Sequence, residues 1–375
     1  MDLLVELDGE NTSFARTEFI TLLKKYFSSA LFQELEKRFL LVKLKGIEDE
    51  VTIKKVKTVA QRVGLSRTIT TLFFVSSRKD YLKSLEENSK EKKEDPFKRL
   101  SIFLQEKGQS SFSFGVSVHF ICSKEERKIF YPEKDVVKGI KKKVGSIILE
   151  RNMGKARVNL SSPDIVISIY LGKRIYTGVS FPCIQRKAFK ERKVQNRPFF
   201  SPVSVEPKWA RASLNLLNLE KGAVVYDPFC GTAGLLIEAG LLGYTPVGSD
   251  INEKMVRGSF LNMRHFGITN FILFQCDVRQ AAENLSRRGI EVDAVVSDFP
   301  YGRASTLGKE EKEKLYNCAF STISKILGRG KKALLIVPSK RDVEMATCHS
   351  LELVYTFPVY IHSTLTRYFS LYRRV

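Results

Sequence analysis

No run of about eighteen apolar residues, the length needed to span a bilayer as a helix, occurs in the 375-residue sequence. The N-terminus opens with acidic residues rather than with the basic and then apolar stretch of a signal peptide. These absences argue against membrane insertion and predict a soluble, cytoplasmic protein. The length is too great for one ordinary domain, so we expect two or three domains, each with its own core.

The six cysteines form no CxxC pair, and no histidine stands at metal-ligand spacing beside any of them. We therefore expect neither a zinc site nor a disulfide framework, and no metal is predicted. Cys348 and His349 are adjacent, but no third member of a nucleophilic site is recognisable. Buried thiols are the better interpretation of the cysteines.

Positive charge is abundant and concentrated in the middle of the chain. Of the net charge of +21, residues 51–200 contribute most, with 33 Lys and Arg against 14 Asp and Glu. Because cations that neutralise phosphates release condensed counterions, such a block predicts a polyanionic partner. The alternative is a solvated lysine-rich surface without a partner.

The first half of the sequence reads as two small α/β regions followed by a linker. Strands are expected at 1–7, 38–46, 68–75 and 112–122, a hairpin at 164–180 that turns at 171–173, and helices near 15–28, 51–63 and 134–150. The charged stretch 84–96, nearly free of apolar side chains, predicts a loop or a frayed helix end at a domain boundary. The polar segment 184–198 has no periodicity and is expected to be a linker.

From about residue 207 the pattern changes to strands alternating with helices, which predicts a parallel, doubly wound sheet. Two late strands near 352–358 and 367–374 predict a C-terminal antiparallel hairpin on that sheet. In such a sheet, ligands bind beyond the carboxyl ends of the strands, near the point where the strand order reverses.

The segment DPFCGTAG (227–234) directly follows the first apolar strand of this half. Gly231 and Gly234 allow a tight turn and close approach of the backbone to a ligand, at the start of a helix. The segment lacks the GxGxxG spacing, which argues against a nicotinamide cofactor. Asp227 suits the amino group of an amino-acid cofactor.

Two further acids end the next two strands. Asp250 ends PVGSD, 23 residues after Asp227, where a carboxylate can accept hydrogen bonds from both ribose hydroxyls. Asp277 ends LFQCD, where an acceptor can meet an adenine amino group. Each of these two could instead merely cap the helix that follows it. Three strand-end acids in one unit are harder to explain as caps.

The fourth strand ends in DFPYG (298–302), which resembles the amino-methyltransferase motif [DNS]-P-P-[YFW]. The N2 lone pair of guanine is delocalised into the ring, so acceptors on its two N–H bonds must turn it toward a methyl group. Asp298 can be one acceptor and the Phe299 carbonyl the other, while Tyr301 offers a stacking face. Phe299 replaces the first proline of the motif, and Pro300 still holds the preceding residue in extended geometry.

Together these segments resemble the Rossmann-fold methyltransferases. RPFFSPVSVEPKWARASLNL (197–216), DFPYGRAS and HSTLTRY (362–368) are similar to the archaeal tRNA guanosine N2-methyltransferases that act at position ten, and 158–180 resembles the end of a THUMP domain. The resemblance implies an α/β architecture with a ferredoxin-like domain at 1–80, THUMP at 81–182, a linker at 183–206 and a Rossmann-fold domain at 207–375. The cofactor would be S-adenosylmethionine and the partner tRNA, gripped at its acceptor end by THUMP.

The resemblance also assigns residues. Around the cofactor it places the turn residues Pro228, Phe229, Gly231 and Thr232, and we expect Ile251 and Val278 there as neighbours of the strand-end acids. Target-base binding falls to Asp298, Phe299, Pro300 and Tyr301, with Arg303 as an additional candidate.

Four other interpretations stay open. A THUMP methyltransferase aimed at guanosine six often has a non-proline at the second motif position, and an adenine N6-methyltransferase of DNA would share the motif without needing THUMP. A catalytically silent tRNA-binding subunit would keep the cofactor pocket, and a nicotinamide oxidoreductase would bind NADH. The sequence does not fix the number of methyl groups, the oligomeric state or the need for a small activating protein.

Overall fold

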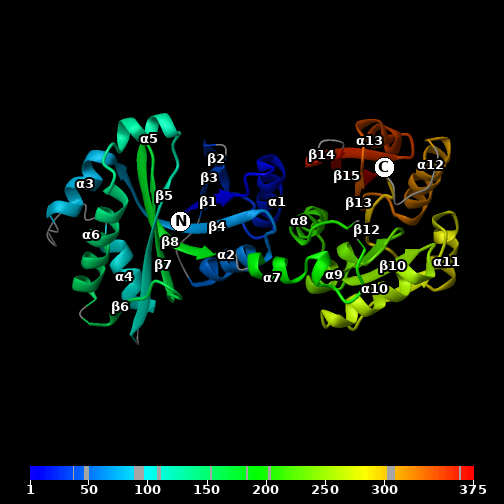
Figure 1. Ribbon diagram of the computed structural model, residues 1–375, viewed down its shortest axis with the longest axis horizontal. Coiled ribbons are helices and arrows are strands. Elements are labelled where there is room, and N and C mark those ends of the chain that lie inside the picture. Colours follow the sequence, from blue (N-terminus) through cyan, green and yellow to red (C-terminus); the bar gives the residue numbers. More distant parts are fainter. Residues whose placement is uncertain are drawn as a thin grey trace. The chain divides into compact units, whose positions relative to one another are not determined.

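The chain folds into two compact units (Figure 1). The computed structural model describes residues 1–36, 38–45, 50–87, 97–107, 111–152, 154–182, 185–201, 204–301, 309–362 and 365–375. The first unit comprises residues 1–9, 26–60 and 66–183, and the second comprises residues 10–25, 61–65 and 184–375. Within the described ranges, no helix combines the length and the apolar character needed to cross a membrane.

An eight-stranded sheet forms the frame of the first unit. Its strand order is β2 (Leu31–Glu36), β3 (Phe39–Lys43), β1 (Asp2–Leu7), β4 (Ser66–Ser77), β8 (Arg174–Pro182), β7 (Ile165–Leu171), β5 (Phe112–Phe120) and β6 (Ala156–Val158). Neighbours are antiparallel, except that β5 runs parallel to both β6 and β7. The predicted hairpin at 164–180 is confirmed as β7 and β8.

The helices of the first unit bury a regular apolar face. Its helices are α2 (Glu50–Arg62), which ends in the second unit, α3 (Arg78–Glu87), α4 (Lys98–Lys107), α5 (Lys124–Phe130) and α6 (Val136–Arg151). In α6 the buried residues are Ile140, Val144, Ile147 and Ile148, which recur at helical spacing. They share one core with side chains of α3, α4, β5, β7 and β8.

The pairing of β4 with β8 bears on the predicted division of the N-terminal half. β4 lies in the region predicted as ferredoxin-like and β8 in the region predicted as THUMP, so both regions contribute to one sheet. The predicted boundary at residue 80 falls within α3. The stretch 84–96, expected as a loop or a frayed helix end, is helical as far as Glu87, and residues 88–96 lie outside the described residues.

A seven-stranded sheet forms the frame of the second unit. Its order is β11 (Ile272–Gln275), β10 (Thr245–Asp250), β9 (Val224–Asp227), β12 (Ala294–Asp298), β13 (Lys332–Val337), β15 (Leu365–Arg374) and β14 (Leu351–His362). The first five strands are parallel, and β15 is antiparallel to both of its neighbours. The predicted parallel sheet with a C-terminal antiparallel hairpin is thus confirmed, and the strand order reverses beside β9.

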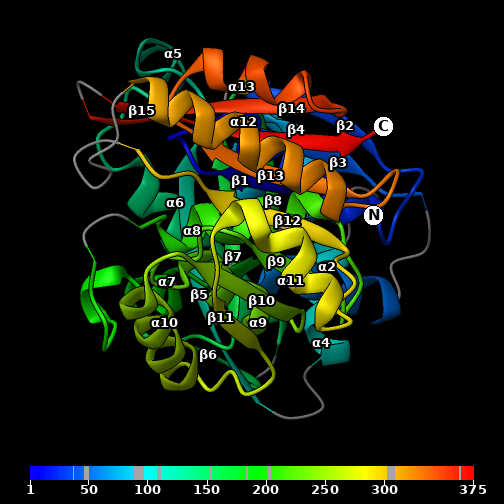
Figure 2. The ribbon, with the colours of Figure 1, turned by 90° about the vertical axis from the view of Figure 1, so that its right-hand side faces the viewer.

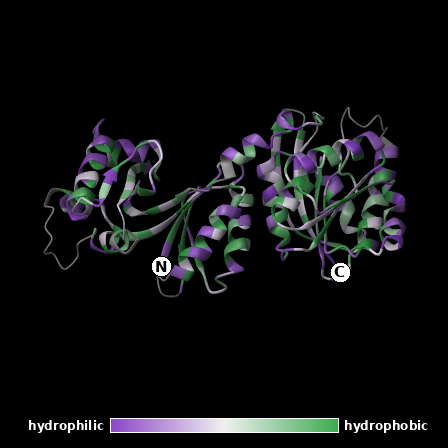
Figure 3. Cartoon of the chain, turned by 90° about the horizontal axis from the view of Figure 1, so that it is seen from below, coloured by the Kyte–Doolittle hydropathy of each residue, from purple (hydrophilic) through white to green (hydrophobic). Residues whose placement is uncertain are grey.

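Helices cover both faces of this sheet. α8 (Pro207–Leu217), α9 (Gly234–Leu241) and α10 (Glu253–His265) form one layer, and α11 (Ala281–Arg287), α12 (Lys309–Ile326) and α13 (Lys340–Thr347) lie in front of the other face in Figure 2. The strands between them are largely green in Figure 3, whereas the helices also carry purple segments, as expected for elements with one buried face.

Helix α1 (Thr12–Lys24) belongs to the second unit although it comes from the N-terminal region. Asn11 caps the helix by accepting the Phe14 amide, and the Phe14 ring stacks on Phe357 of β14 with ring centres 4.5 Å apart. Trp209 of α8 packs beside the same ring at 5.6 Å. Aromatic packing therefore joins the N-terminal segment to the sheet of the second unit.

The segment expected as a linker contains α7 (Gln185–Glu191) and a 3-10 turn at Val194–Asn196. Its arginines Arg192 and Arg197 are buried. The sequence shows no periodicity here because these residues are held by charge pairing rather than by an apolar stripe. Strand β2 and helices α3, α4, α5, α8 and α13 were likewise not predicted.

Candidate active site

A cavity of about 760 Å³ opens at the carboxyl ends of β9, β10, β11 and β12. Parallel strands bring their carboxyl ends to one edge of a sheet, so residues far apart in sequence meet there. All of the predicted cofactor and base residues line this cavity: Asp227, Pro228, Phe229, Gly231, Thr232, Gly234, Asp250, Ile251, Asp277, Val278, Asp298, Phe299, Pro300 and Tyr301. Arg303 lies outside the described residues.

The turn after β9 has the backbone geometry that its glycines predict. Gly231 has a φ of 50° and Ala233 a φ of 62°, so the chain passes through the left-handed region before α9 begins. Gly234 is required for space, because a Cβ there would lie 2.7 Å from the Ser204 hydroxyl oxygen. The turn is therefore packed tightly against Ser204, and its residues line the cavity.

Asp227 lies at the bottom of the cavity and is almost fully buried. Its Oδ1 accepts hydrogen bonds from the Ser297 hydroxyl at 2.6 Å and from the Phe229 amide at 3.1 Å. Burial raises the pKa of this carboxyl to about 7, and the neighbouring charges of Asp298 and Asp250 act in the same direction. A cationic ligand in the cavity would relieve this repulsion.

Asp250 fixes the turn to the next strand. Its two oxygens accept the Gly231 amide at 3.0 Å and the Asn252 amide at 2.9 Å, and burial raises the pKa of the carboxyl. Each carboxylate oxygen has a second lone pair, so these bonds leave capacity for hydroxyl donors.

Asp277 caps the 3-10 helix η2 (Val278–Gln280) by accepting the Arg279 amide at 2.9 Å. Its carboxylate also pairs with the Arg279 side chain, which lowers the pKa of Asp277. The capping interpretation that the sequence left open is therefore present in the structure. Asp277 also lines the cavity, and its assignment to an adenine amino group stays a prediction.

Asp298 ends β12, and its side chain is 15% exposed beside the cavity. Burial raises its pKa to about 6, whereas the positive charge of Arg367 lowers it. Oδ1 of Asp298 has no hydrogen-bond partner among the described residues. This oxygen is therefore a candidate acceptor for a donor on a bound ligand.

The Phe299 ring packs into the protein core. The ring is 1% exposed and lies between Phe229, Tyr316 and Phe320, with ring centres 4.9 to 5.1 Å apart. This aromatic cluster thus accommodates Phe299, which replaces the first proline of the motif. The Tyr316 hydroxyl donates a hydrogen bond to the Pro300 carbonyl at 2.9 Å, which fixes the backbone at Pro300.

The RPFF segment contacts the turn after β9 through Thr232. Arg197 donates to the Ser204 hydroxyl at 3.0 Å and to the Thr232 hydroxyl at 3.3 Å. Asn262 of α10 accepts the Phe199 amide at 2.9 Å and donates to the carbonyls of Phe199 and Thr232, both at 3.0 Å. The predicted linker is therefore bonded to a residue that lines the cavity.

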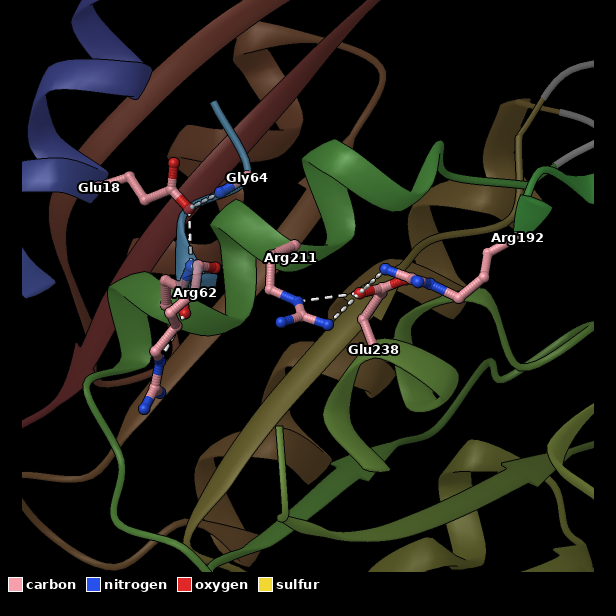
Figure 4. A network of polar contacts seen from close by, with 7 residues as sticks. Glu18, Arg62, Gly64, Arg192, Arg211 and Glu238 are labelled. Carbon is pink, nitrogen blue, oxygen red and sulfur yellow. Dashed lines mark hydrogen bonds and ion pairs between the residues drawn. The ribbon is translucent and has the colours of Figure 1, made fainter. Parts of the chain in front are cut away.

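A buried charge cluster anchors the same linker further back (Figure 4). Glu238 of α9 is 1% exposed and accepts Arg192 Nε at 2.5 Å and Arg211 Nε at 2.9 Å. Arg192 in turn offers its carbonyl to Arg197 Nε at 3.1 Å. The cluster thus connects α7, α8 and α9 to Arg197, which contacts the turn after β9.

A second buried acid ties α1 to the same unit (Figure 4). Glu18 accepts the amides of Gly64 at 2.7 Å and Leu65 at 2.9 Å, as well as the Asn215 side chain at 2.7 Å. Arg62 Nε donates to the side-chain oxygen Oδ1 of Asn215 at 3.0 Å. Two segments of the N-terminal region are held against α8 by these bonds.

Sequence reasoning missed several residues that line the cavity or contact Asp298 beside it. Lys314, Leu315 and Cys318 reach the cavity from α12, and Ser204 and Val205 reach it from the linker. Arg367, within the HSTLTRY segment, places Nη1 3.7 Å from Oδ2 of Asp298. The segment was noted as part of a resemblance, but nothing in its local pattern indicated this pairing.

Comparison with known proteins identifies the family. A family model described as "RMKL-like, methyltransferase domain" matches residues 195–367. The tRNA (guanine(10)-N2)-dimethyltransferase of Pyrococcus abyssi is 34% identical over 62% of this chain and 68% of its own length. The enzyme of the same name from Methanothermobacter thermautotrophicus is 31% identical over 70% of this chain and 74% of its own length.

The chain belongs to the tRNA (guanine(10)-N2)-methyltransferase family. The crystal structure of TrmN from Thermus thermophilus matches the whole chain with a TM-score of 0.57 at 19% identity, which supports the fold. The predicted α/β methyltransferase fold and the resemblance to this family are both confirmed.

Membership of the tRNA guanine-N2-methyltransferase family identifies S-adenosylmethionine as the methyl donor. The cavity fits this cofactor in size, since ligand pockets of roughly 300–1,000 Å³ hold molecules of this class. It also fits in charge, because buried carboxylates suit a ligand that carries a sulfonium and an ammonium group. No group of three or more potential metal ligands occurs in the part of the chain that the structure describes.

Proposed function

We propose that this protein transfers a methyl group from S-adenosylmethionine to N2 of guanosine 10 in tRNA. The sequence identity to two enzymes named for this reaction, over more than two thirds of their length, carries the proposal. The unpartnered Oδ1 of Asp298 at the cavity supports it, because the reaction needs an acceptor for a base amino group at that place.

The chemistry follows from two acceptors at the end of β12. When bound, S-adenosylmethionine supplies an electrophilic methyl group on a cationic sulfur. Asp298 and the Phe299 carbonyl would each accept one N2–H bond of guanine, which turns the nitrogen lone pair toward the methyl carbon. The N–C bond would form as the carbon–sulfur bond breaks, which would leave a neutral thioether and a positively charged N2. Asp298 would then take the proton from N2 and restore its neutrality.

We assign the cofactor to the turn residues and strand-end acids. Asp227 would hold the ammonium group, Asp250 the ribose hydroxyls and Asp277 the adenine, with Pro228, Phe229, Gly231, Thr232, Gly234, Ile251 and Val278 as the surrounding wall. Their common position on one cavity supports the assignment.

We propose that the first unit is a THUMP-containing module that binds the tRNA. The proposed domain limits of the whole chain are 1–80 (ferredoxin-like), 81–182 (THUMP), 183–206 (linker) and 207–375 (methyltransferase). Support comes from the charge of residues 51–200 and from α6, where Lys138, Lys141, Lys142 and Lys143 are all exposed. Lysines on one element beside a sheet provide the phosphate contacts that nucleic-acid binding requires. A cytoplasmic location follows from a tRNA substrate.

We further propose that two methyl groups are added, as the names of both archaeal relatives say of those enzymes. After the first transfer, N2 retains one hydrogen, so a single acceptor suffices to orient it. Asp298 would then serve in both rounds.

Mass spectrometry of modified nucleosides on in vitro transcribed tRNA tests the proposal. We expect one and then two methyl groups at guanosine 10 and none on a transcript with adenosine at that position. Asp298→Ala should bind tRNA normally but lose at least about 100-fold in rate, because general-base catalysis and positioning contribute about 10²–10⁴-fold.

Glu291→Ala, which changes an exposed acid just before β12, is the matched control and should keep full activity. Methylation at guanosine 6 would establish the rival specificity. An inactive wild type that still binds tRNA would indicate a silent subunit, and calorimetric binding of NADH rather than S-adenosylmethionine would refute the methyltransferase assignment.

A further inference from the structure

The sheet topology brings an arginine to the base-binding end of the cavity. β15 runs antiparallel to β13, and Tyr368 pairs with Val337 at the carboxyl end of β13. β12 is parallel to β13, with Asp298 paired to Ile336. The first residues of β15 therefore lie at the edge where the parallel strands end, and Arg367 is among them.

Arg367 contacts two of the residues assigned to the target base. Its Nη1 lies 3.7 Å from Asp298 Oδ2, and its guanidinium carbon lies 5.1 Å from the centre of the Tyr301 ring. The Arg367 side chain is 9% exposed, and its buried Nε has no hydrogen-bond partner among the residues with described positions. Burying a guanidinium costs free energy, and the Asp298 carboxylate and the Tyr301 ring are the contacts that offset part of this cost.

We propose that Arg367 is a positioning residue that keeps Asp298 ionised, with Oδ1 free to accept the amino group of the target base. This inference rests on the proposed function and extends it to a residue outside the DFPYG motif. A protonated Asp298 would present a donor to a base donor, and only the ionised form has both oxygens available as acceptors.

Burial disfavours the ionised form of Asp298, and among the described titratable groups Arg367 is the one that favours it. Asp227 on β9 is a neighbouring acid that carries no positive charge. Burial raises the pKa values of Tyr301, just after β12, and Tyr316 on α12, so both phenols are neutral. Among the residues that the structure describes, Arg367 on β15 is the cation that pairs with this carboxylate.

The pH dependence of methyl transfer to tRNA under single-turnover conditions tests this role. Arg367→Gln should move the acid limb of the rate profile upward by about one to three pH units, the effect of removing an opposite charge within 4–6 Å of a carboxyl. Arg367→Lys should restore the limb to its original position. Arg373→Gln, on the same strand but paired with Glu352 at the surface, is the matched control and should not shift it.

A second measurement separates this inference from the proposed function. Carbon-13 NMR of the Asp298 carboxyl, assigned with Asp298→Asn, reports its pKa in the protein without tRNA, and Arg367→Gln should raise that pKa. An unchanged limb and an unchanged carboxyl pKa in a folded Arg367→Gln protein would overturn the role of Arg367. An inactive wild type would count against the proposed function alone, because the NMR titration needs no substrate.

If Arg367→Gln does not fold, Arg367→Met replaces it, since Met has similar length and no charge. Circular dichroism establishes folding of each variant. Should neither neutral variant fold, Arg367→Lys decides, because an unchanged acid limb supports the charge role and a limb moved upward overturns it.

Discussion

Glu238→Gln tests whether the buried charge cluster holds the linker to the second unit. The substitution keeps the shape of the side chain and removes its charge. The charge of Glu238 would then no longer offset the buried charges of Arg192 and Arg211, whose side chains are 10% and 5% exposed. Removing one partner of a buried ion pair costs about 3–5 kcal/mol, much more than loss of an exposed pair.

The expected change in melting temperature follows from the size of the unit. For a unit of this size, each kcal/mol shifts the midpoint by about 2–4 °C, so Glu238→Gln should lower it by on the order of 10 °C. The control is Glu253→Gln, because Glu253 pairs with Arg257 on the surface at exposures of 58% and 78%. An exposed pair is worth about 0–1 kcal/mol, and the control should change the midpoint by a few degrees at most.

The sequence provides a specific probe for this measurement. Trp209 is the single tryptophan of the chain, lies in α8 of the second unit and is 4% exposed. Its fluorescence therefore reports unfolding of the second unit. If the Trp209 transition of Glu238→Gln coincides with that of Glu253→Gln, the cluster does not stabilise the unit and the reasoning is refuted.

A functional consequence accompanies the loss of stability. Arg192 accepts a hydrogen bond from Arg197, and Arg197 donates to Thr232 at the cavity wall. Calorimetry below the melting range should show weaker S-adenosylmethionine binding by Glu238→Gln than by Glu253→Gln. Equal affinities would mean that the contact from the linker to Thr232 does not affect cofactor binding.

Three other outcomes are expected. Glu18→Gln should destabilise the second unit by about 1–3 kcal/mol in urea unfolding, because an amide cannot accept both backbone N–H groups that Glu18 accepts, and an unchanged midpoint would contradict this. Gly258→Ala should weaken cofactor binding, since its Cβ would lie 2.0 Å from the Phe199 ring, whereas Gly139→Ala, with open space around it, should not. The affinity for S-adenosylmethionine should fall by up to about tenfold per unit as the pH drops below about 7, because protonation of Asp227 removes a charge that attracts a cation, and a flat profile between pH 6 and 8 would refute that role.

The catalytic half was predictable because its signals are local. A strand that ends in an acid, followed by glycines and a helix, places that acid at the carboxyl edge of a parallel sheet whatever the rest of the chain does. Asp227, Asp250 and Asp298 were found in this way, and all three lie on one cavity. The positions of β9, β10 and β12 followed from apolar runs of strand length.

Long-range charge pairing was not predictable in the same way. Arg192 and Glu238 are separated by 46 positions, and Asp298 and Arg367 by still more, so neither pair leaves a periodic pattern. Arginines in a polar segment are typical of a solvated linker, and only the fold shows that Arg192 and Arg197 are buried. The assignment of α1 to the second unit escaped prediction for the same reason, because its apolar face matches any neighbouring core.

The path of the chain has a consequence for how this protein can be divided. The polypeptide enters the methyltransferase unit with α1, leaves it, returns for residues 61–65 and enters it finally at residue 184. A fragment starting at residue 184 would lack the Phe14 ring that stacks on β14 and the Glu18 carboxylate beside α8. The catalytic half is consequently not a transferable cassette, and gene fusions or truncations that separate it from the first 65 residues would expose an apolar face that α1 covers in the intact chain.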